Sequence, residues 1–279
     1  MEKTDRNREM EKAVKNLWSL LNDFEDYTEY GFVTGSREEF PGFNSIPEIP
    51  GAAEEGLQGT PAGRSGVSFS GAQPVEKGEL LSGRVNSPAP ENDSLDLVAS
   101  EVERCEKCRL CRKRKKTVPG AGAVPAGVMV IGEGPGAEED ASGIPFVGAA
   151  GKYLDKWLSA ISLDRNRNCF IGNIVKCRPP GNRDPLPDEI EACLPYLERQ
   201  ITLLKPQAIL AVGRISGRII TGRDETLGRL RGKTYSYRGI PVIVTYHPSA
   251  VLRDRGYRPA VWEDLKLLKE LIDRQADVR

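Results

Sequence analysis

The chemistry of this chain centres on a single histidine. His247 is the only histidine among 279 residues, and it lies in the segment "TYHPSAVLR" (245–253), where an apolar run meets a proline. An imidazole can donate a hydrogen bond or move a proton near neutral pH. A lone histidine is otherwise often a structural residue, so its role depends on which other segments meet it in the fold.

The cysteines indicate a metal site. A C-x2-C pair and two cysteines far downstream could supply four ligands, namely Cys105, Cys108, Cys177 and Cys193. Two pairs of thiolates can hold a tetrahedral zinc ion or an iron–sulfur cluster. A zinc ribbon would use two C-x2-C knuckles, and the wide second pair fits a cluster better. Unrelated thiols are the alternative; Cys111 is an alternative ligand, and Cys169 is expected in the core.

A glycine-rich loop offers a close approach to a ligand. "GEGPGAEEDASGIPFVGAAG" (132–151) contains neither G-x-G-x-x-G nor G-K-[ST]. Its acidic residues would repel phosphate: Glu133, Glu138, Glu139 and Asp140. We therefore expect the glycines to bring the backbone close to a flat ligand, with Phe146 available for stacking.

The elements that must position these residues alternate along the chain. Strands are predicted at 127–134, 168–177, 207–213 and 240–248, the last preceded by a hairpin-like segment at 232–239. Helices are predicted at 149–162, 187–205 and 260–275. This alternation predicts a three-layer α/β fold, with a mainly parallel sheet and helices on both faces. Ligands of such sheets bind beyond the carboxyl ends of the strands. Three segments would meet there: "GEGPG" after the first strand, "NIVKCRPP" on the second and "YHPSAVLR" after the fourth.

The first 95 residues differ from the rest. Residues 1–34 include an amphipathic helix at 8–28, which either docks a partner or packs on the main domain, and 35–95 read as a flexible Gly/Pro/Ser-rich linker. We expect this disordered extension to precede one domain at 96–279. Residues 1–95 carry nine basic and seventeen acidic groups, whereas 96–279 carry thirty-one and twenty-three. The basic part indicates an anionic partner such as nucleic acid, or a solvated mixed-charge surface.

Composition also suggests the compartment. No run of about 18 apolar residues is present, so no membrane span is expected. The opening "MEKTDRNREMEKAV" is too charged for a signal peptide. We expect a cytoplasmic protein, in which cysteines serve as ligands or free thiols more often than in disulfides.

Three separated motifs together resemble a known family. "GEGPGAEEDASGIPFVG", "NIVKCRPPGNRDP" and "HPSAVLR", in this order and with the four cysteines, closely resemble family 4 uracil-DNA glycosylases, the iron–sulfur enzymes of bacteria and archaea. The resemblance covers about residues 98–275. It implies a uracil-glycosylase-type fold and hydrolysis of the N-glycosidic bond of deoxyuridine in DNA, which initiates base-excision repair. The protein would then be a nucleoid-associated monomer.

The resemblance also assigns a cofactor and the pocket backbone. It implies a [4Fe-4S] cluster held by Cys105, Cys108, Cys177 and Cys193. Gly132, Glu133 and Gly134 would line the uracil pocket through their backbone. Glu133 is the nearest carboxylate that could orient the attacking water or stabilise a cationic sugar.

Side chains from the other motifs would recognise the flipped base. Phe146 would stack on the uracil ring, Asn173 would read its edge, and His247 would lie at uracil O2. Ser249 and Arg253, in the segment after the histidine, would contact DNA.

The motifs depart from the family pattern at two places. The family usually has Ala at position 134 and Arg at position 144, where this chain has Gly134 and Ile144. The alternative function is therefore a catalytically weak protein that binds uracil or another lesion in DNA. A replication or repair protein could dock on residues 8–28 in either case.

Overall fold

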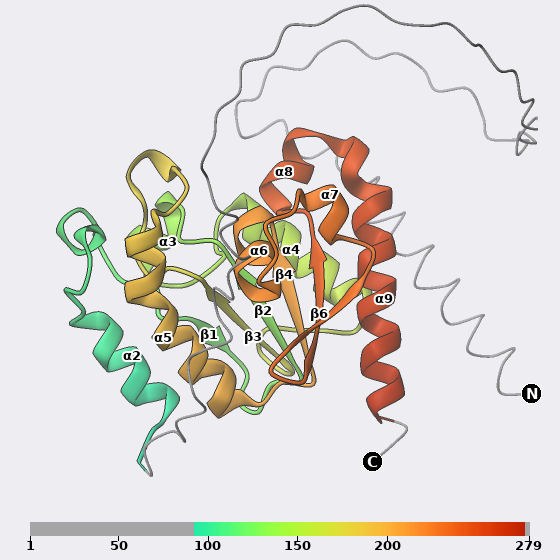
Figure 1. Ribbon diagram of the computed structural model, residues 1–279, viewed down its shortest axis with the longest axis horizontal. Helices are drawn as coiled ribbons and strands as arrows, with labels where there is room; N and C mark the ends of the chain where they lie inside the picture. Colours follow the sequence, from blue (N-terminus) through green and yellow to red (C-terminus); the bar gives the residue numbers. More distant parts are fainter. Residues whose placement is uncertain (1–91, 277–279) are drawn as a thin grey trace, which may run out of the picture.

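The computed structural model describes residues 92–276, so the predicted helix at 8–28 and the linker up to residue 91 lie outside the described residues. Helices and strands alternate along the described chain (Figure 1) in the order α2 (Leu95–Glu103), η2 (Arg109–Arg112), β1 (Ala121–Gly122), β2 (Val128–Gly132), α3 (Ala137–Ser142), α4 (Ala149–Ala160), β3 (Cys169–Asn173), η3 (Pro180–Asn182), α5 (Pro187–Leu204), β4 (Ala208–Val212), α6 (Arg214–Thr221), α7 (Leu227–Leu230), β5 (Thr234–Tyr237), β6 (Ile240–Thr245), α8 (Pro248–Arg253), η4 (Arg255–Tyr257) and α9 (Arg258–Ala276). No helix in this part of the chain is long and apolar enough to cross a membrane.

One mixed sheet forms the centre of the fold. Its strand order is β1-β3-β2-β4-β6-β5. The four inner strands run parallel, and the two edge strands pair antiparallel with their neighbours. The expected hairpin joins β5 to β6 through Arg238 and Gly239, with φ angles of 51° and 84°. Two positive φ values in a two-residue loop match the twist of the flanking strands.

Helices cover both faces of the sheet, which confirms the predicted three layers. Strand β2 shows the division: Val128 and Val130 belong to a core with α4, α8 and α9, whereas Met129 and Ile131 belong to a core with α2, α5, α6 and α7. Because the inner strands are buried on both faces, they read as continuous apolar runs in the sequence.

Helix α5 anchors the segment that carries the first cysteines. Arg199 of α5 forms ion pairs of 2.6 Å with both Asp93 and Glu101, on either side of the start of α2. Val98 and Val102 of α2 pack in the same core as α5. These contacts bring the C-x2-C pair, which follows α2, against α5.

Two predicted strands are longer than the observed ones. β3 ends at Asn173 rather than Cys177, because Lys176 folds back: its ammonium donates to the Asn173 carbonyl at 2.9 Å, and its backbone N–H donates to Cys193 Sγ at 3.2 Å. β6 ends at Thr245, and Pro248 begins α8. The short helices α3, α6 and α8, which follow β2, β4 and β6, were not predicted.

Candidate active site

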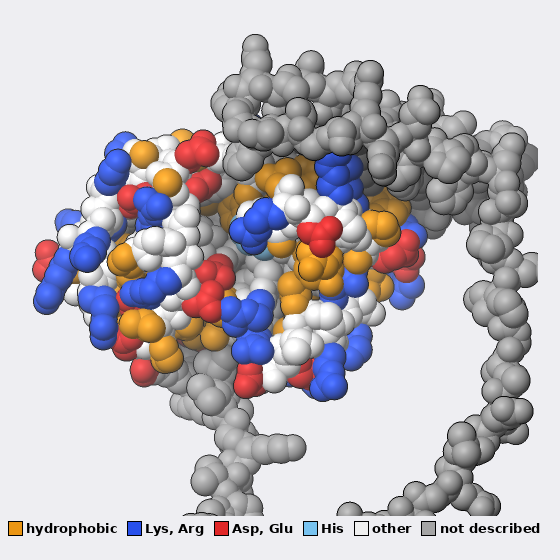
Figure 2. Space-filling view, turned by 90° about the horizontal axis from the view of Figure 1, so that it is seen from above, with side chains coloured by type: hydrophobic (Ala, Val, Ile, Leu, Met, Phe, Trp, Pro, Cys, Tyr) orange, Lys and Arg blue, Asp and Glu red, His pale blue; other side chains and the backbone are white. Residues whose placement is uncertain are grey.

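The three motifs meet at the carboxyl ends of the parallel strands, as expected. Gly132 ends β2 and Asn173 ends β3, and the two residues are register partners. His247 follows β6 and caps the N-terminus of α8. Figure 2 views this end of the molecule and shows a hollow with the imidazole in it and Lys and Arg side chains around it. Arg214 and Arg253, which are both exposed, belong to this end of the fold.

An unpaired acceptor lies at the centre of the site. Asn173 is only 1% exposed, and its Oδ1 accepts no hydrogen bond within residues 92–276. A Cβ at Gly132 would lie 2.5 Å from this oxygen and 2.7 Å from Cζ of Phe146. Glycine at this position therefore lets the backbone, the amide and the ring converge. A buried acceptor without a partner costs about 1–3 kcal/mol, which a ligand N–H would recover.

The histidine lies beside the same ring. The ring centroids of Phe146 and His247 are 5.6 Å apart, with a tilt of 34°. Nδ1 of His247 accepts from the Ser249 backbone N–H at 3.2 Å and lies 2.7 Å from the Ser249 hydroxyl oxygen. A neutral imidazole must then carry its proton on Nε2. Burial, and to a lesser extent Arg253, lower the pKa of His247 to about 4, so the ring is neutral at pH 7.

The loop that carries Phe146 is held by charged side chains. Phe146 has a φ of 52°, which is strained for an aromatic residue. Arg165 donates to the carbonyls of Pro145 and Phe146, at 3.0 and 2.9 Å. Glu139 accepts from the next two backbone N–H groups, those of Val147 and Gly148, at 2.9 and 3.0 Å. The loop is thus fixed from both sides.

The sequence did not indicate that Glu139 and Arg165 belong to the site. Glu139 had been interpreted only as a charge that would repel phosphate. Its carboxylate instead links Val147 and Gly148 to the N-terminus of α3, where it also accepts from Gly136 N at 3.1 Å. Arg165 lies nineteen residues from Phe146, and nothing in its local pattern marks it.

Glu133 is the carboxylate with the most perturbed acidity at this end. Burial raises its pKa to about 7; Asp184 raises it further and Arg214 opposes the rise. Arg214 and Asp184 form an ion pair of 2.5 Å. The carboxyl is therefore close to half protonated at neutral pH, which suits a group that accepts a proton from water.

The two departures from the family pattern differ in their surroundings. A Cβ at Gly134 would meet Val175 Cγ2 at 2.8 Å and Pro179 Cδ at 3.6 Å, and no pocket side chain is among its nearest contacts. Ile144 is 48% exposed. A methyl group at position 134 would therefore press on Val175, and the side chain at position 144 lies largely in solvent.

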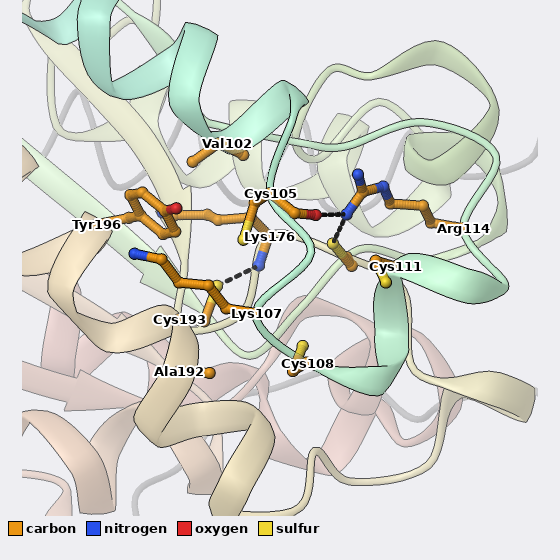
Figure 3. A pocket seen from close by; sticks show the side chains of 11 residues that line it. Val102, Cys105, Lys107, Cys108, Cys111, Arg114, Lys176, Ala192, Cys193 and Tyr196 are labelled. Carbon is orange, nitrogen blue, oxygen red and sulfur yellow. Dashed lines mark hydrogen bonds between the residues drawn. The ribbon is translucent and has the colours of Figure 1, made fainter.

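The four predicted ligands surround one pocket on the α5 side of the sheet. Figure 3 shows the sulfur atoms of Cys105, Cys108 and Cys193 around a common space. Cys177 and Cys111 also line this pocket, whereas Cys169 lies in the other core, as expected. No three Cys, His, Asp or Glu side chains of the described chain are placed to bind one metal ion together.

Two of the cysteine sulfur atoms in this pocket accept hydrogen bonds. Arg114 donates to Cys177 Sγ at 3.3 Å, and the Lys176 backbone N–H donates to Cys193 Sγ at 3.2 Å. Burial raises the pKa of Cys193 to about 12, so a thiolate there needs a bound cation. The same Arg114 guanidinium also donates to the Cys105 carbonyl at 2.7 Å, so this arginine of the basic segment faces the cysteine pocket.

Comparison with known proteins agrees with this geometry. The model of the uracil DNA glycosylase superfamily matches residues 119–266. Type-4 uracil-DNA glycosylases from Saccharolobus solfataricus and Pyrobaculum aerophilum are 45% and 48% identical, over 64% and 60% of this chain and 87% and 88% of each relative. A type-4 enzyme from Thermotoga maritima is 37% identical over 65% of this chain and 96% of its own length.

The superfamily model thus matches more than half of the chain, and the matched part contains the parallel strands whose ends carry the three motifs. The chain belongs to the uracil-DNA glycosylase superfamily, and within it to the type-4 enzymes.

Proposed function

We propose that this protein is a uracil-DNA glycosylase that removes uracil from DNA and so initiates base-excision repair. The observation that carries the proposal is the unpaired Asn173 Oδ1, buried beside the ring of Phe146. Uracil presents an N3–H donor between two carbonyl acceptors on a flat ring. Its N3–H fits the orphan acceptor, its face fits Phe146, and its O2 fits the Nε2–H of His247.

Base flipping brings uracil into this site at a cost of a few kcal/mol. Stacking on Phe146 would return roughly 1–3 kcal/mol. Asn173 accepts from N3–H and donates to O4; cytosine has the opposite pattern at this edge and would leave both groups unpaired. Ser249 and Arg253, which follow the histidine, would contact the DNA backbone around the flipped nucleotide. The Ser249 hydroxyl also lies 2.7 Å from His247 Nδ1.

Cleavage breaks the bond between C1′ of the sugar and N1 of the base. The bonding electrons move onto the base and charge develops on O2, where the Nε2–H of His247 stabilises it. Glu133 accepts a proton from the water that adds to C1′, and its negative charge stabilises the cationic sugar. The uracil anion then takes up a proton from solvent and Glu133 returns its proton to solvent, so the products are free uracil and an abasic site.

The cysteine pocket is proposed to hold a [4Fe-4S] cluster through Cys105, Cys108, Cys177 and Cys193. Four thiols that surround a space without converging on one point fit a cluster, because each thiolate binds a different iron. The N–H bonds to Cys177 and Cys193 fit an anionic sulfur cluster as well. When bound, the cluster would tie the segment after α2 and the exit of β3 to α5.

Removing one proposed ligand should release iron. We expect Cys193→Ser to lose most of its bound iron, and Cys111→Ser to retain wild-type iron content and visible absorbance. Iron and zinc analysis of the purified variants gives the comparison. Stoichiometric zinc in the wild type would contradict the cluster, and equal losses would make Cys111 a ligand.

The acidity of Glu133 predicts a pH profile. Its pKa is raised to about 7, so the carboxylate form grows as pH rises through 7, and single-turnover cleavage should rise with it. His247 adds no second change there, because its pKa is about 4. Glu133→Gln should flatten this rise. An unchanged profile in the variant would remove Glu133 from the proton transfer.

The support of the Phe146 loop should matter for turnover. Arg165→Met removes two hydrogen bonds to the loop but keeps an apolar stem, and we expect cleavage about 10-fold slower, since a shift of 1 Å can cost up to ~10²-fold. Arg167→Met, an exposed arginine of the same segment, is the control. Equal rates for both variants would show that the loop holds without Arg165.

The test of the function is a single-turnover incubation with a uracil-containing oligonucleotide, followed by alkali to break abasic sites. Strand breaks at uracil support the glycosylase. Tight binding without breaks would favour the catalytically weak lesion-binding protein, and Gly134→Ala with Ile144→Arg would then test whether the departures explain it.

The remaining proposals concern the oligomeric state, the cellular location and the partner of the protein. We propose that the protein acts as a monomer in the cytoplasm, at the nucleoid, and that residues 8–28 dock a replication or repair protein. Deleting residues 1–91 should leave cleavage of naked DNA intact while abolishing capture of such a partner. Loss of cleavage in the deletion would give the N-terminal segment a role in the reaction itself.

A further inference from the structure

A buried lysine lies between the active site and the cysteine pocket. Lys176 is 1% exposed, and its ammonium donates to the Asn173 carbonyl at 2.9 Å and to Gln200 Oε1 at 2.7 Å. The amide nitrogen of Gln200 donates to the Pro119 carbonyl at 2.7 Å, which fixes Gln200 with its oxygen toward the lysine. The ammonium thus holds the residue whose side chain carries the orphan acceptor.

This buried cation has no carboxylate partner. Both acceptors of the Lys176 ammonium are neutral, and no Asp or Glu between residues 92 and 276 forms an ion pair with it. A buried charge without a counter-ion is costly, so proteins usually pair it. A neutral side chain could fill this volume at lower cost unless negative charge is present nearby.

The cysteine pocket is the place where such charge would lie. Lys176 lines that pocket and precedes Cys177, and its backbone N–H donates to Cys193 Sγ at 3.2 Å (Figure 3). Metal-bound cysteines are thiolates. Four of them around this space would supply the negative charge that the lysine lacks.

We propose that Lys176 couples the two sites: its ammonium balances the metal-bound thiolates, and its hydrogen bond to the Asn173 carbonyl keeps Asn173 Oδ1 directed at the bound base. Lys176 is therefore a positioning residue that touches neither the base nor the metal. The inference rests on the proposed uracil site and on a metal centre in the cysteine pocket. It predicts that a metal centre on one face of the sheet affects base recognition at the strand ends.

The experiment compares Lys176→Met with Lys107→Met. Lys107 lines the same pocket, but it is exposed, and its ammonium lies 4.6 Å from the centre of the Tyr196 ring rather than at the Asn173 carbonyl. The first readout is the rate at which a chelator removes bound metal. We expect Lys176→Met to lose metal about 10–100-fold faster than the wild type, as for other partners of metal ligands, and Lys107→Met to match the wild type.

The second readout is base selectivity, measured on metal-loaded protein. The preference for uracil over 3-methyluracil, which lacks the N3–H, should fall about 10-fold in Lys176→Met, because a misplaced Asn173 aligns less well with the base, and stay unchanged in Lys107→Met. If the wild type binds uracil DNA without cleaving it, the same ratio is measured as affinities. That result would refute the proposed cleavage reaction, whereas the ratio of affinities would still test the role of Lys176.

Lys176→Gln separates the two roles and serves if Lys176→Met does not fold. It removes the charge but keeps donors, so metal loss should be fast while part of the selectivity remains. Equal metal loss in the Lys176 and Lys107 variants overturns the inference. So does wild-type selectivity in metal-loaded Lys176→Met, or a wild type that carries no metal.

Discussion

His247→Ala should slow single-turnover cleavage of uracil DNA by ~10²–10³-fold, because one hydrogen-bond donor at a developing oxyanion is typically worth that much. The donor is the Nε2–H of a neutral ring, since Nδ1 already accepts from Ser249. Binding of DNA should change little, because the ring acts mainly as charge develops on uracil O2. The loss should be the same across neutral pH, given a pKa of about 4.

A neighbouring tyrosine provides the control. Tyr246→Phe keeps the stack on Tyr257, whose ring centroid is 4.2 Å away, and should cleave at the wild-type rate. Ser249→Ala removes the hydroxyl beside Nδ1 but not the backbone donor, so a smaller loss is expected. Unchanged cleavage in His247→Ala would end the leaving-group role of the imidazole.

The framework of the site was predictable because its signals are local. Buried parallel strands read as apolar runs, and α4 buries Tyr153, Leu154, Trp157 and Leu158 on one face at helical spacing. Once the sheet is parallel, the ends of β2, β3 and β6 must lie at one edge. That rule alone brings Gly132, Asn173 and His247 together. Their individual roles came from the family resemblance and remain proposals.

The supports of the site were not predictable, because they depend on contacts between distant segments. Arg165 reaches back to the Phe146 loop, and Glu139 ties that loop to the start of α3. Lys176 ended β3 four residues before the predicted end, through contacts with Gln200 and Cys193 that its own segment does not show. A charged residue in sequence predicts an exposed face; only the fold shows which charges it buries.

Asn173→Leu should separate stability from function. Leucine has nearly the shape of asparagine but neither accepts from uracil N3–H nor donates to O4. Leaving these groups unpaired costs about 1–3 kcal/mol each, so cleavage should fall by about 10²-fold or more. The same change removes a buried acceptor that has no partner in the free protein. The free energy of unfolding should therefore rise by about 1 kcal/mol.

Asn168→Leu, at the other end of β3, is expected to do the reverse. Asn168 Oδ1 accepts from Asp164 N at 2.7 Å, and its amide nitrogen donates to the Ser162 carbonyl at 3.2 Å. Replacing this satisfied amide should lower stability by about 1–2 kcal/mol and slow cleavage far less than Asn173→Leu does. Denaturant unfolding and single-turnover assays on both variants decide the matter. If both variants lose stability, Asn173 Oδ1 already has a hydrogen-bond partner in the free protein. The site would then hold no unpaired acceptor for uracil N3–H.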